Sequence, residues 1–184
     1  MIQEQREIIV LGAGGWIGNA LVTELRRQQQ PVRPVDRTGL TDWLKDNRPS
    51  GPVIYAIGLT ADFRQYPHET VEAHVTLVSK VVKKKNLDRL VLLSSTRVYE
   101  GNEDTRETAH LSCLPSNPSD IYNLSKLLGE ALVLQDQRKG FKVVRISNVV
   151  GTSQAPETFI GALLQEAKSK GRIEIRQSSE STKD

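Results

Sequence analysis

The sequence predicts an α/β protein with a doubly wound parallel sheet and helices on both faces, and three observations support this fold class. Short apolar runs recur along the 184 residues, each bounded by glycine, proline or polar residues. These runs alternate with longer segments whose apolar residues fall at helical spacing, as in right-handed βαβ units. The first run leads into a cluster of glycines that opens a helical segment.

The elements follow from these patterns in chain order. Short apolar runs predict strands over residues 7–11, 31–35, 53–57, 89–94 and 142–146. Alternation of apolar and charged residues predicts a sixth strand over residues 173–176. The prolines of the second run place that strand at an edge of the sheet. Helical spacing predicts helices over residues 16–27, 41–47, 67–85, 120–138 and 156–168. The polar segment 100–118 is expected to be a long loop, and loops of that length are usually functional or mobile.

Composition limits the classes of partner. The 25 basic and 22 acidic residues leave a net charge of +3, too small an excess to predict nucleic-acid or membrane binding. The single cysteine, Cys113, excludes an internal disulfide, and the histidines lack the spacing of metal ligands. No apolar stretch approaches the roughly 20 residues that span a bilayer, and the polar N-terminus lacks a signal-peptide pattern. We therefore expect a cytoplasmic protein without a metal.

The glycine cluster reads Gly-Ala-Gly-Gly-Trp-Ile-Gly over residues 12–18, with the spacing G-x-x-G-x-x-G. Glycines permit a tight turn and a close approach of the backbone to a diphosphate, while the helix N-terminus supplies amide donors and a favourable dipole. This predicts a Rossmann-type NAD(P)-binding domain over residues 1–176, followed by a polar tail at 177–184. The cofactor-binding residues expected here are Gly12, Gly14, Gly15, Trp16, Ile17 and Gly18.

Asp36 follows the second predicted strand, where an acidic residue accepts hydrogen bonds from the ribose hydroxyls of the adenosine. Its carboxylate would repel a 2′-phosphate, which favours NAD over NADP. The neighbouring Arg37 could instead bind that phosphate, so NADP remains an alternative. Without a cofactor, the two residues would form a solvated turn.

Tyr122 and Lys126 lie four residues apart on a predicted helix, so their side chains share a face. An ammonium near a phenol favours the phenolate, and the pKa of Tyr122 is expected to fall from about 10 toward working pH. Tyr122 is therefore a candidate general acid and base.

Ser94, Ser95 and Thr96 end the fourth predicted strand, at the carboxyl edge where an open α/β sheet binds its ligands. A hydroxyl there can hydrogen-bond a substrate carbonyl or alcohol; alternatively, Ser95 only caps the strand end. We expect Ser94 near the cofactor and Ser95, Thr96 and Arg97 near the substrate. A surface role for Arg97 is an equal alternative.

Four stretches together resemble the extended short-chain dehydrogenases/reductases of the sugar-nucleotide epimerase/dehydratase type. They are residues 12–18, Leu-Leu-Ser-Ser-Thr-Arg-Val-Tyr at 92–99, Pro-Ser-Asp-Ile-Tyr-Asn-Leu-Ser-Lys at 118–126 and Arg-Ile-Ser-Asn-Val-Val-Gly at 145–151. The resemblance implies Ser95 as the catalytic hydroxyl, Tyr122 as acid/base and Lys126 as the residue that binds the nicotinamide ribose. It also implies cofactor contacts at Ala56, Ile57 and Gly58 and a nucleotide-sugar contact at Asn148.

The sequence departs from this family in three places. His74 stands where the family usually has an asparagine. The stretch between Asp36 and Val53 is too short for a further strand and its crossover helix, which is closer to the dTDP-4-dehydrorhamnose reductase branch. Family members usually continue into a C-terminal substrate region, which we expect to be absent or truncated here.

These features predict an NAD(P)-dependent oxidoreductase that acts on a nucleotide-activated sugar by transient hydride transfer at a Ser-Tyr-Lys site. A sugar-nucleotide reductase of the dTDP-4-dehydrorhamnose type, a reductase of a non-sugar carbonyl and a non-catalytic NAD(P)-binding module remain alternatives. Helices 67–85 and 120–138 would share one outer face. In relatives such a pair forms a two-fold dimer, so the resemblance implies a homodimer.

Overall fold

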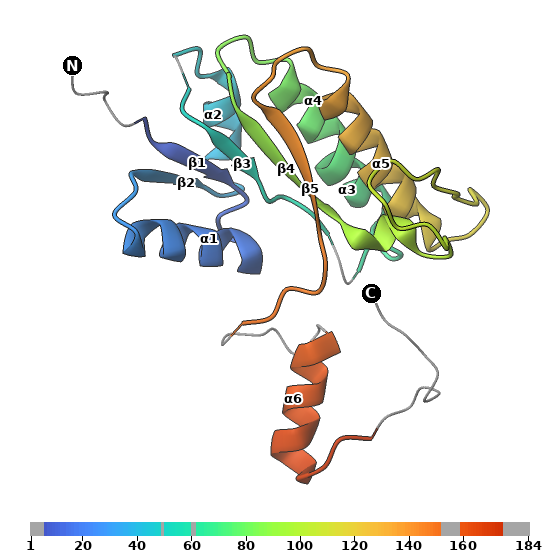
Figure 1. Ribbon diagram of the computed structural model, residues 1–184. Helices are drawn as coiled ribbons and strands as arrows, with labels where there is room; N and C mark the ends of the chain where they lie inside the picture. The colour runs from blue at the N-terminus through green and yellow to red at the C-terminus, as the bar shows by residue number, and fades with distance from the viewer. Residues whose placement is uncertain (1–5, 49, 60–61, 152–158, 175–184) are drawn as a thin grey trace. The chain divides into compact units, whose positions relative to one another are not determined.

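A parallel sheet of five strands forms the centre of the described chain (Figure 1). The structure is a computed structural model that describes residues 6–48, 50–59, 62–151 and 159–174. The strands are β1 (Ile8–Leu11), β2 (Val32–Val35), β3 (Val53–Tyr55), β4 (Leu90–Ser95) and β5 (Phe141–Ile146), in the order β2-β1-β3-β4-β5. Every neighbouring pair is parallel. The predicted Rossmann-type α/β fold is confirmed.

Helices lie on both faces of this sheet (Figure 1). On one face, α1 (Trp16–Arg27) contacts β1 and β2. On the other face lie α2 (Leu40–Lys45), α4 (Leu77–Val82) and α5 (Asp120–Leu134). The short α3 (Pro67–Val71) continues through a π-helical turn, η1 (Glu72–Thr76), into α4, and a 3-10 turn, η2 (Thr96–Tyr99), follows β4.

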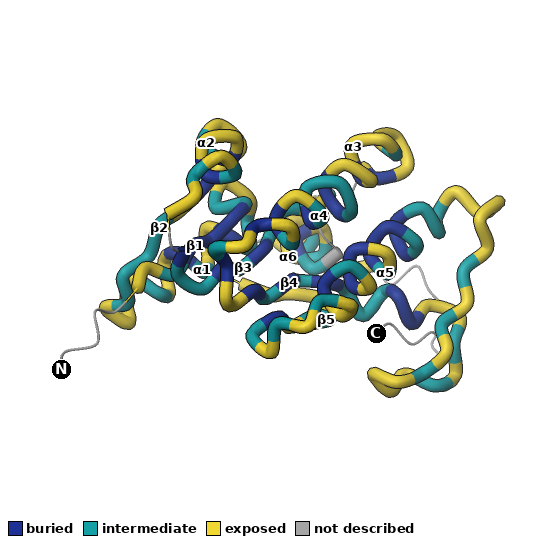
Figure 2. The backbone as a smooth tube through the Cα atoms, turned by 90° about the horizontal axis from the view of Figure 1, so that it is seen from above, coloured by how far each residue is buried: buried dark blue, intermediate teal, exposed yellow. Residues whose placement is uncertain are grey.

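The core lies between the sheet and the helices α2, α4 and α5, where the buried residues gather (Figure 2). The side chains of Leu11, Tyr55 and Leu90, from β1, β3 and β4, are each at most 1% exposed. They belong to one cluster with Trp43 of α2 and Val81 of α4. Burying one such side chain stabilises the fold by about 1.5–3 kcal/mol. This packing holds the helices against the sheet.

The chain reverses its direction across the sheet between β1 and β3. From β1 it runs outward to β2 at the edge, and then crosses back through α2 to β3 on the other side of β1. The described residues of this short connection contain no further strand, as expected. The carboxyl ends of β1 and β3 therefore flank the switch point, where open α/β sheets bind their ligands.

Three helices end earlier than predicted, at residues 45, 82 and 134 instead of 47, 85 and 138. Arg138 turns back to donate to the carbonyl oxygens of Lys84 at 2.7 Å and Leu87 at 3.0 Å, and also to that of Val82. Carbonyl groups at a helix end have no partner within the helix. The guanidinium satisfies them and opposes the negative end of the helix dipole, so it stabilises an end of α4 at this point.

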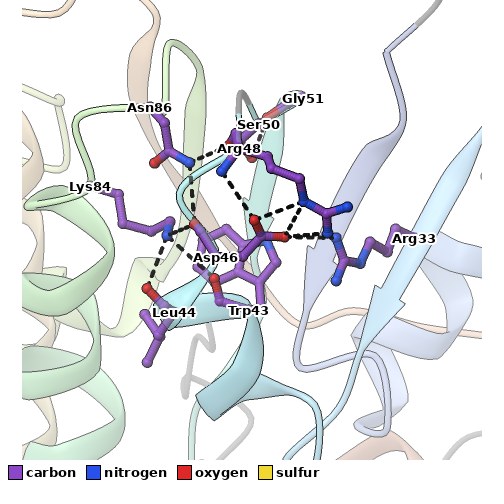
Figure 3. Close-up of polar contacts among 9 residues, drawn as sticks. All are labelled: Arg33, Trp43, Leu44, Asp46, Arg48, Ser50, Gly51, Lys84 and Asn86. Atoms are coloured by element: carbon purple, nitrogen blue, oxygen red, sulfur yellow. Dashed lines mark hydrogen bonds and ion pairs between the residues drawn. The ribbon is translucent and has the colours of Figure 1, made fainter.

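Lys84 has the same role at the end of α2 (Figure 3). Its ammonium donates to the carbonyl oxygens of Trp43, Leu44 and Asp46 at 3.3, 3.0 and 2.7 Å. The carboxylate of Asp46 pairs in turn with Arg48 at 2.6 Å. Burial lowers the pKa of Lys84, and the charge of Asp46 opposes that effect. Lys84 therefore ties α2 to the segment that follows α4.

The chain divides into two compact units, residues 1–146 and 147–184. The second unit contains α6 (Phe159–Lys170), close to the predicted helix 156–168. Ile173 and Glu174 are not in a strand, so this part of the sixth predicted strand is wrong. Residues 175–184, which include the predicted polar tail, lie outside the described residues. A single domain over 1–176 stays a prediction.

Within the described ranges, no helix combines the length and the apolar character needed to cross a bilayer. The cytoplasmic location expected from the sequence stays a prediction.

Arg138→Ala is expected to lower the free energy of unfolding by about 2 kcal/mol. The variant leaves buried carbonyl groups without a donor and removes a guanidinium stacked 4.0 Å from the centre of the Phe141 ring. Urea titration followed by circular dichroism measures the change. Arg106→Ala is the matched control, because Arg106 pairs with Asp104 at the same 2.7 Å but is 81% exposed. Equal losses for the two variants would show that the helix cap contributes nothing.

Candidate functional site

Two glycines of the turn let three backbone segments meet at the ends of β1 and β3. Gly12 has a φ of +87°, and a Cβ there would lie 2.9 Å from the carbonyl group of Ala56 and from the amide nitrogen of Ile57. A Cβ on Gly18 would lie 2.1 Å from the carbonyl oxygen of Gly12. Neither position can hold a side chain, so α1 begins directly against the end of β1.

The N-terminus of α1 is open to an anion. Its N-cap residue, Gly15, offers no side-chain acceptor, and the first turn contains no acidic residue. The amides of Trp16, Ile17 and Gly18 have no partner within the helix. These donors and the helix dipole together fit a diphosphate group.

Asp36 lies beside this turn, with its Cβ 3.8 Å from where a Cβ on Gly14 would be. Its Oδ1 accepts hydrogen bonds from the hydroxyl of Thr38 at 2.7 Å and from the amides of Thr38 and Gly39 at 3.0 Å. These hydrogen bonds hold the pKa of Asp36 below its ordinary value, and the bond from the Thr38 hydroxyl has the largest effect. All three go to Oδ1, which leaves Oδ2 as the acceptor for a ribose hydroxyl. The exposed Arg37 follows in the same turn.

The segment after β3 leads from the glycine turn to α5. Ala56 packs against Gly12, as described above. Two residues later, a Cβ on Gly58 would lie 3.1 Å from Nε2 of His74 and 3.5 Å from Nζ of Lys126. The residues predicted to bind the cofactor after β1 and β3 therefore lie along one edge that reaches Lys126.

Tyr122 and Lys126 are both buried on α5, as their spacing predicts, at 5% and 8% exposure. Nζ of Lys126 donates to the carbonyl oxygen of Leu93 at 3.2 Å and lies 5.8 Å from the centre of the Tyr122 ring. Burial lowers the pKa of Lys126 to about 8, although the charge of Glu130 opposes this effect. The ammonium of Lys126 therefore loses its proton at a lower pH than an ordinary lysine.

The predicted fall in the pKa of Tyr122 is wrong for this structure. Burial raises its pKa, and the hydrogen bond with Ser95 and the charge of Arg97 offset burial only in part. Residue spacing does not reveal desolvation, which penalises the phenolate. Ser95 also caps η2, since its Oγ accepts from the amide of Arg97 at 3.2 Å. The capping role and the contact with Tyr122 therefore belong to the same hydroxyl.

His74 lies in the candidate site. In the sequence it stood out only because the family usually has an asparagine at this position. The side chain is 2% exposed and lies in the π-helical turn η1. Such turns are frequent at functional sites. The hydroxyl of Tyr55 donates to the carbonyl oxygen of Ala73 at 2.5 Å, beside the widened turn. A Cβ on Gly129 would lie 2.4 Å from the carbonyl oxygen of His74, so α5 packs directly on this backbone.

The hydrogen bonds around His74 assign its tautomer. Nδ1 lies 2.9 Å from Oγ of Ser125, whose own proton goes to the carbonyl oxygen of Tyr122 at 2.9 Å. Ser125 must therefore accept, and Nδ1 carries the proton. Nε2 is then a buried acceptor that has no partner among the described residues. Burial, helped by the charge of Lys126, lowers the pKa of His74 to about 3.

The hydroxyls of Ser94 and Ser95 have different partners. Oγ of Ser94 donates to Oε1 of Glu130, and Arg145 pairs with the same carboxylate at 2.7 Å. Arg145 also donates to the hydroxyl of Tyr99 at 2.7 Å. Ser94 thus takes part in a buried network that ties α5 to β4 and β5. Its predicted cofactor contact stays a prediction.

The residues predicted to bind substrate fall in both units. Thr96 begins η2, and the guanidinium carbon of Arg97 lies 5.7 Å from the centre of the Tyr122 ring. Asn148 lies in the second unit, so its role stays a prediction. Within the described part of the chain, no group of three or more His, Cys, Asp and Glu side chains could hold a metal ion.

A parallel sheet with a glycine turn at its switch point, and an acidic residue after the second strand, is the arrangement of Rossmann-type dinucleotide-binding proteins. The chain belongs to the NAD dependent epimerase/dehydratase family, whose pattern matches residues 8–184. The family expected from the motifs is thereby confirmed. No match was found among curated proteins.

Several solved structures are similar to the chain. MoeE5 in complex with UDP-glucose and NAD is 24% identical, with a TM-score of 0.66 over 90% of this chain and 62% of MoeE5. Its complex with UDP-glucuronic acid and NAD is 25% identical, with a TM-score of 0.66 over 87% and 60%. The dTDP-4-dehydrorhamnose reductase from Bacillus anthracis, in complex with NADP, is 19% identical, with a TM-score of 0.69 over 89% and 60%.

TunA, an NAD dependent NDP-hexosamine 5,6-dehydratase, is 19% identical, with a TM-score of 0.72 over 90% of this chain and 62% of TunA. Identities below 25% show the shared fold alone. The chain spans 60–62% of the length of these proteins.

Protonation of His74 is expected to destabilise the fold in acid. Its pKa is lowered to about 3 in the folded protein, against about 6.5 for an unfolded chain. The contribution of neutral His74 to the free energy of unfolding is therefore fully present above pH ~6.5. This free energy falls by a few kcal/mol as the pH falls toward 3. His74→Asn cannot titrate, so its unfolding free energy should depend less on pH between ~6.5 and 4. Urea titrations at each pH measure this slope.

The control is His68→Asn, because His68 is exposed. That variant should keep the wild-type slope. A His74→Asn slope equal to that of the wild type would mean that His74 does not titrate as described.

Proposed function

We propose that this chain binds NAD(P) and takes part in transient oxidation of a nucleotide-activated sugar by hydride transfer at a Ser95-Tyr122-Lys126 site. The proposal rests on one observation. Ser95, Tyr122 and Lys126 lie close together, and the short segment 56–58 leads from the glycine turn to Lys126. Membership of an NAD dependent family supports the cofactor. MoeE5, 25% identical, has been solved with UDP-glucuronic acid and NAD, which supports the substrate class.

The residues present fit a dinucleotide. The amides at the start of α1 would hold the diphosphate, and Oδ2 of Asp36 would accept from the adenosine ribose. Lys126 gives one of its three N–H groups to Leu93 and would offer the others to the nicotinamide ribose. The bound cofactor supplies the hydride acceptor.

Tyr122 would accept the proton of a sugar hydroxyl while Ser95 hydrogen-bonds the same oxygen. A buried phenol with a raised pKa is a poor base, so its ionisation requires additional positive charge nearby. A nicotinamide cation bound beside Lys126 would supply that charge. The ring of Phe63, with its centre 5.2 Å from that of Tyr122, excludes water from one side of the phenol.

Asp36→Asn is expected to weaken NAD binding about tenfold, because a neutral amide replaces a charged acceptor. NADP should gain relative to NAD, since the repulsion of a 2′-phosphate is removed. Calorimetric titrations with each dinucleotide measure the ratio. Asp42→Asn, at an exposed acid of α2, is the control. An unchanged ratio in Asp36→Asn would exclude Asp36 from the dinucleotide site.

Tyr122→Phe is expected to lower turnover at least 100-fold while NAD affinity stays within about twofold. The ring is kept, and only the proton-transfer group is lost. Absorbance of the reduced cofactor and chromatography of products, over a panel of nucleotide-sugars, measure turnover. Tyr66→Phe is the control, because Tyr66 is 48% exposed. Full turnover in Tyr122→Phe would remove Tyr122 as the base.

A non-catalytic NAD(P)-binding module is a second candidate, because burial raises the pKa of Tyr122 and so disfavours the phenolate that proton transfer needs. Calorimetric binding of a dinucleotide without turnover of any nucleotide-sugar would favour this alternative. Net consumption of the reduced cofactor would instead indicate a reductase of the dTDP-4-dehydrorhamnose type.

We also propose a homodimer formed through α3, α4 and α5, which pack side by side. Leu128 and Leu134 of α5 are 52% and 60% exposed and would become buried. Leu128→Glu should shift the protein toward monomer, because a carboxylate would enter an apolar contact. Light scattering measures the mass. A wild-type protein that is monomeric at every concentration tested would contradict the dimer.

A further inference from the structure

Arg97 is held over the aromatic wall of the Tyr122 site. Its guanidinium carbon lies 5.1 Å from the centre of the Phe63 ring and 5.7 Å from that of Tyr122. Its backbone amide donates to Oγ of Ser95 at 3.2 Å, so the residue is fixed to the predicted catalytic hydroxyl. The cation is therefore held beside the ring of Tyr122, two residues after Ser95 in the chain.

The hydrogen bonds of Arg97 are incomplete. Nε is buried and has no partner among the described residues. One terminal nitrogen pairs with Oε2 of Glu100 at 3.1 Å, but Glu100 is 59% exposed. Leaving a buried N–H without an acceptor costs free energy. No protein group of the described residues accepts a hydrogen bond from Nε.

The other two arginines of this region have their partners. Nε and one terminal nitrogen of Arg64 donate to Oγ of Ser119 at 3.1 and 2.8 Å. Arg145 is paired with Glu130 and with the hydroxyl of Tyr99. Arg97 therefore differs from both in presenting a buried donor without a protein acceptor.

We propose that Arg97 binds a carboxylate on the sugar, so that the substrate class is a nucleotide-activated uronic acid rather than a neutral hexose. The inference rests on the proposed function and deepens it. A carboxylate offers two coplanar oxygens that match the two terminal N–H groups of a guanidinium. It would take the place of Glu100, whose exposed ion pair is weak. The reacting carbon is then held beside Tyr122 by a charged contact.

The test compares UDP-glucuronate with UDP-glucose by calorimetry, with and without NAD. Wild type should bind UDP-glucuronate at least tenfold more tightly. Arg97→Gln should reduce this preference to less than twofold, and Arg97→Lys should keep part of it. Arg64→Gln is the matched control, since Arg64 stacks on the same Phe63 ring at 4.5 Å, and it should keep the preference. In ¹⁵N-labelled protein, the Nε–H resonance of Arg97 should shift with UDP-glucuronate and not with UDP-glucose.

Three outcomes would overturn the inference: no preference for UDP-glucuronate in the wild type, no binding of either nucleotide-sugar, or an equal loss for both in Arg97→Gln. The last result would mean that Arg97 holds the diphosphate that the two ligands share. Failure to bind NAD(P) contradicts the proposed function instead, and the titrations without NAD then still decide the role of Arg97.

Discussion

A close contact between backbone segments, which only glycine permits, determines where the candidate site lies. The carbonyl oxygen of Gly12 lies where a Cβ on Gly18 would be, and a Cβ on Gly12 would strike Ala56. Because no side chain separates them, the ends of β1 and β3 and the start of α1 meet at one point. The amides of α1 then face the switch point, and the backbone from Ala56 leads directly to Gly58 and Lys126.

Burial, more than charge pairing, governs the ionisable groups beyond this contact. Desolvation is the largest cause of the raised pKa of Tyr122 and of the lowered pKa values of Lys126 and His74. Each shift favours the neutral form. A dry site of this kind responds strongly to any charge that enters it, since an added cation is poorly screened there. The acidity of Tyr122 is therefore set by what binds beside it.

The sequence was sufficient wherever the determining contacts are local. The glycine turn, the parallel sheet implied by βαβ units and the shared face of Tyr122 and Lys126 depend on neighbours in the chain. The predicted ends of α2 and α4 were wrong because Lys84 and Arg138, which cap them, are distant in the sequence. The predicted fall in the pKa of Tyr122 was wrong because desolvation depends on tertiary packing. The place and tautomer of His74 follow from the π-helical turn and from the hydrogen bond that Ser125 donates. Residue spacing reveals neither of these.

The geometry of Tyr122 and Lys126 depends on the first unit alone. Glu130, one turn beyond Lys126, pairs with Arg145 of β5 and accepts from Ser94 of β4. These contacts fix α5 to β4, whose end carries Ser95, and to β5, and all of them precede residue 147. The glycine turn and Asp36 lie in the same unit. The groups that would bind a dinucleotide and transfer a proton are thus positioned together, and the residues proposed to bind the sugar in this unit are Ser95 and its neighbours in η2.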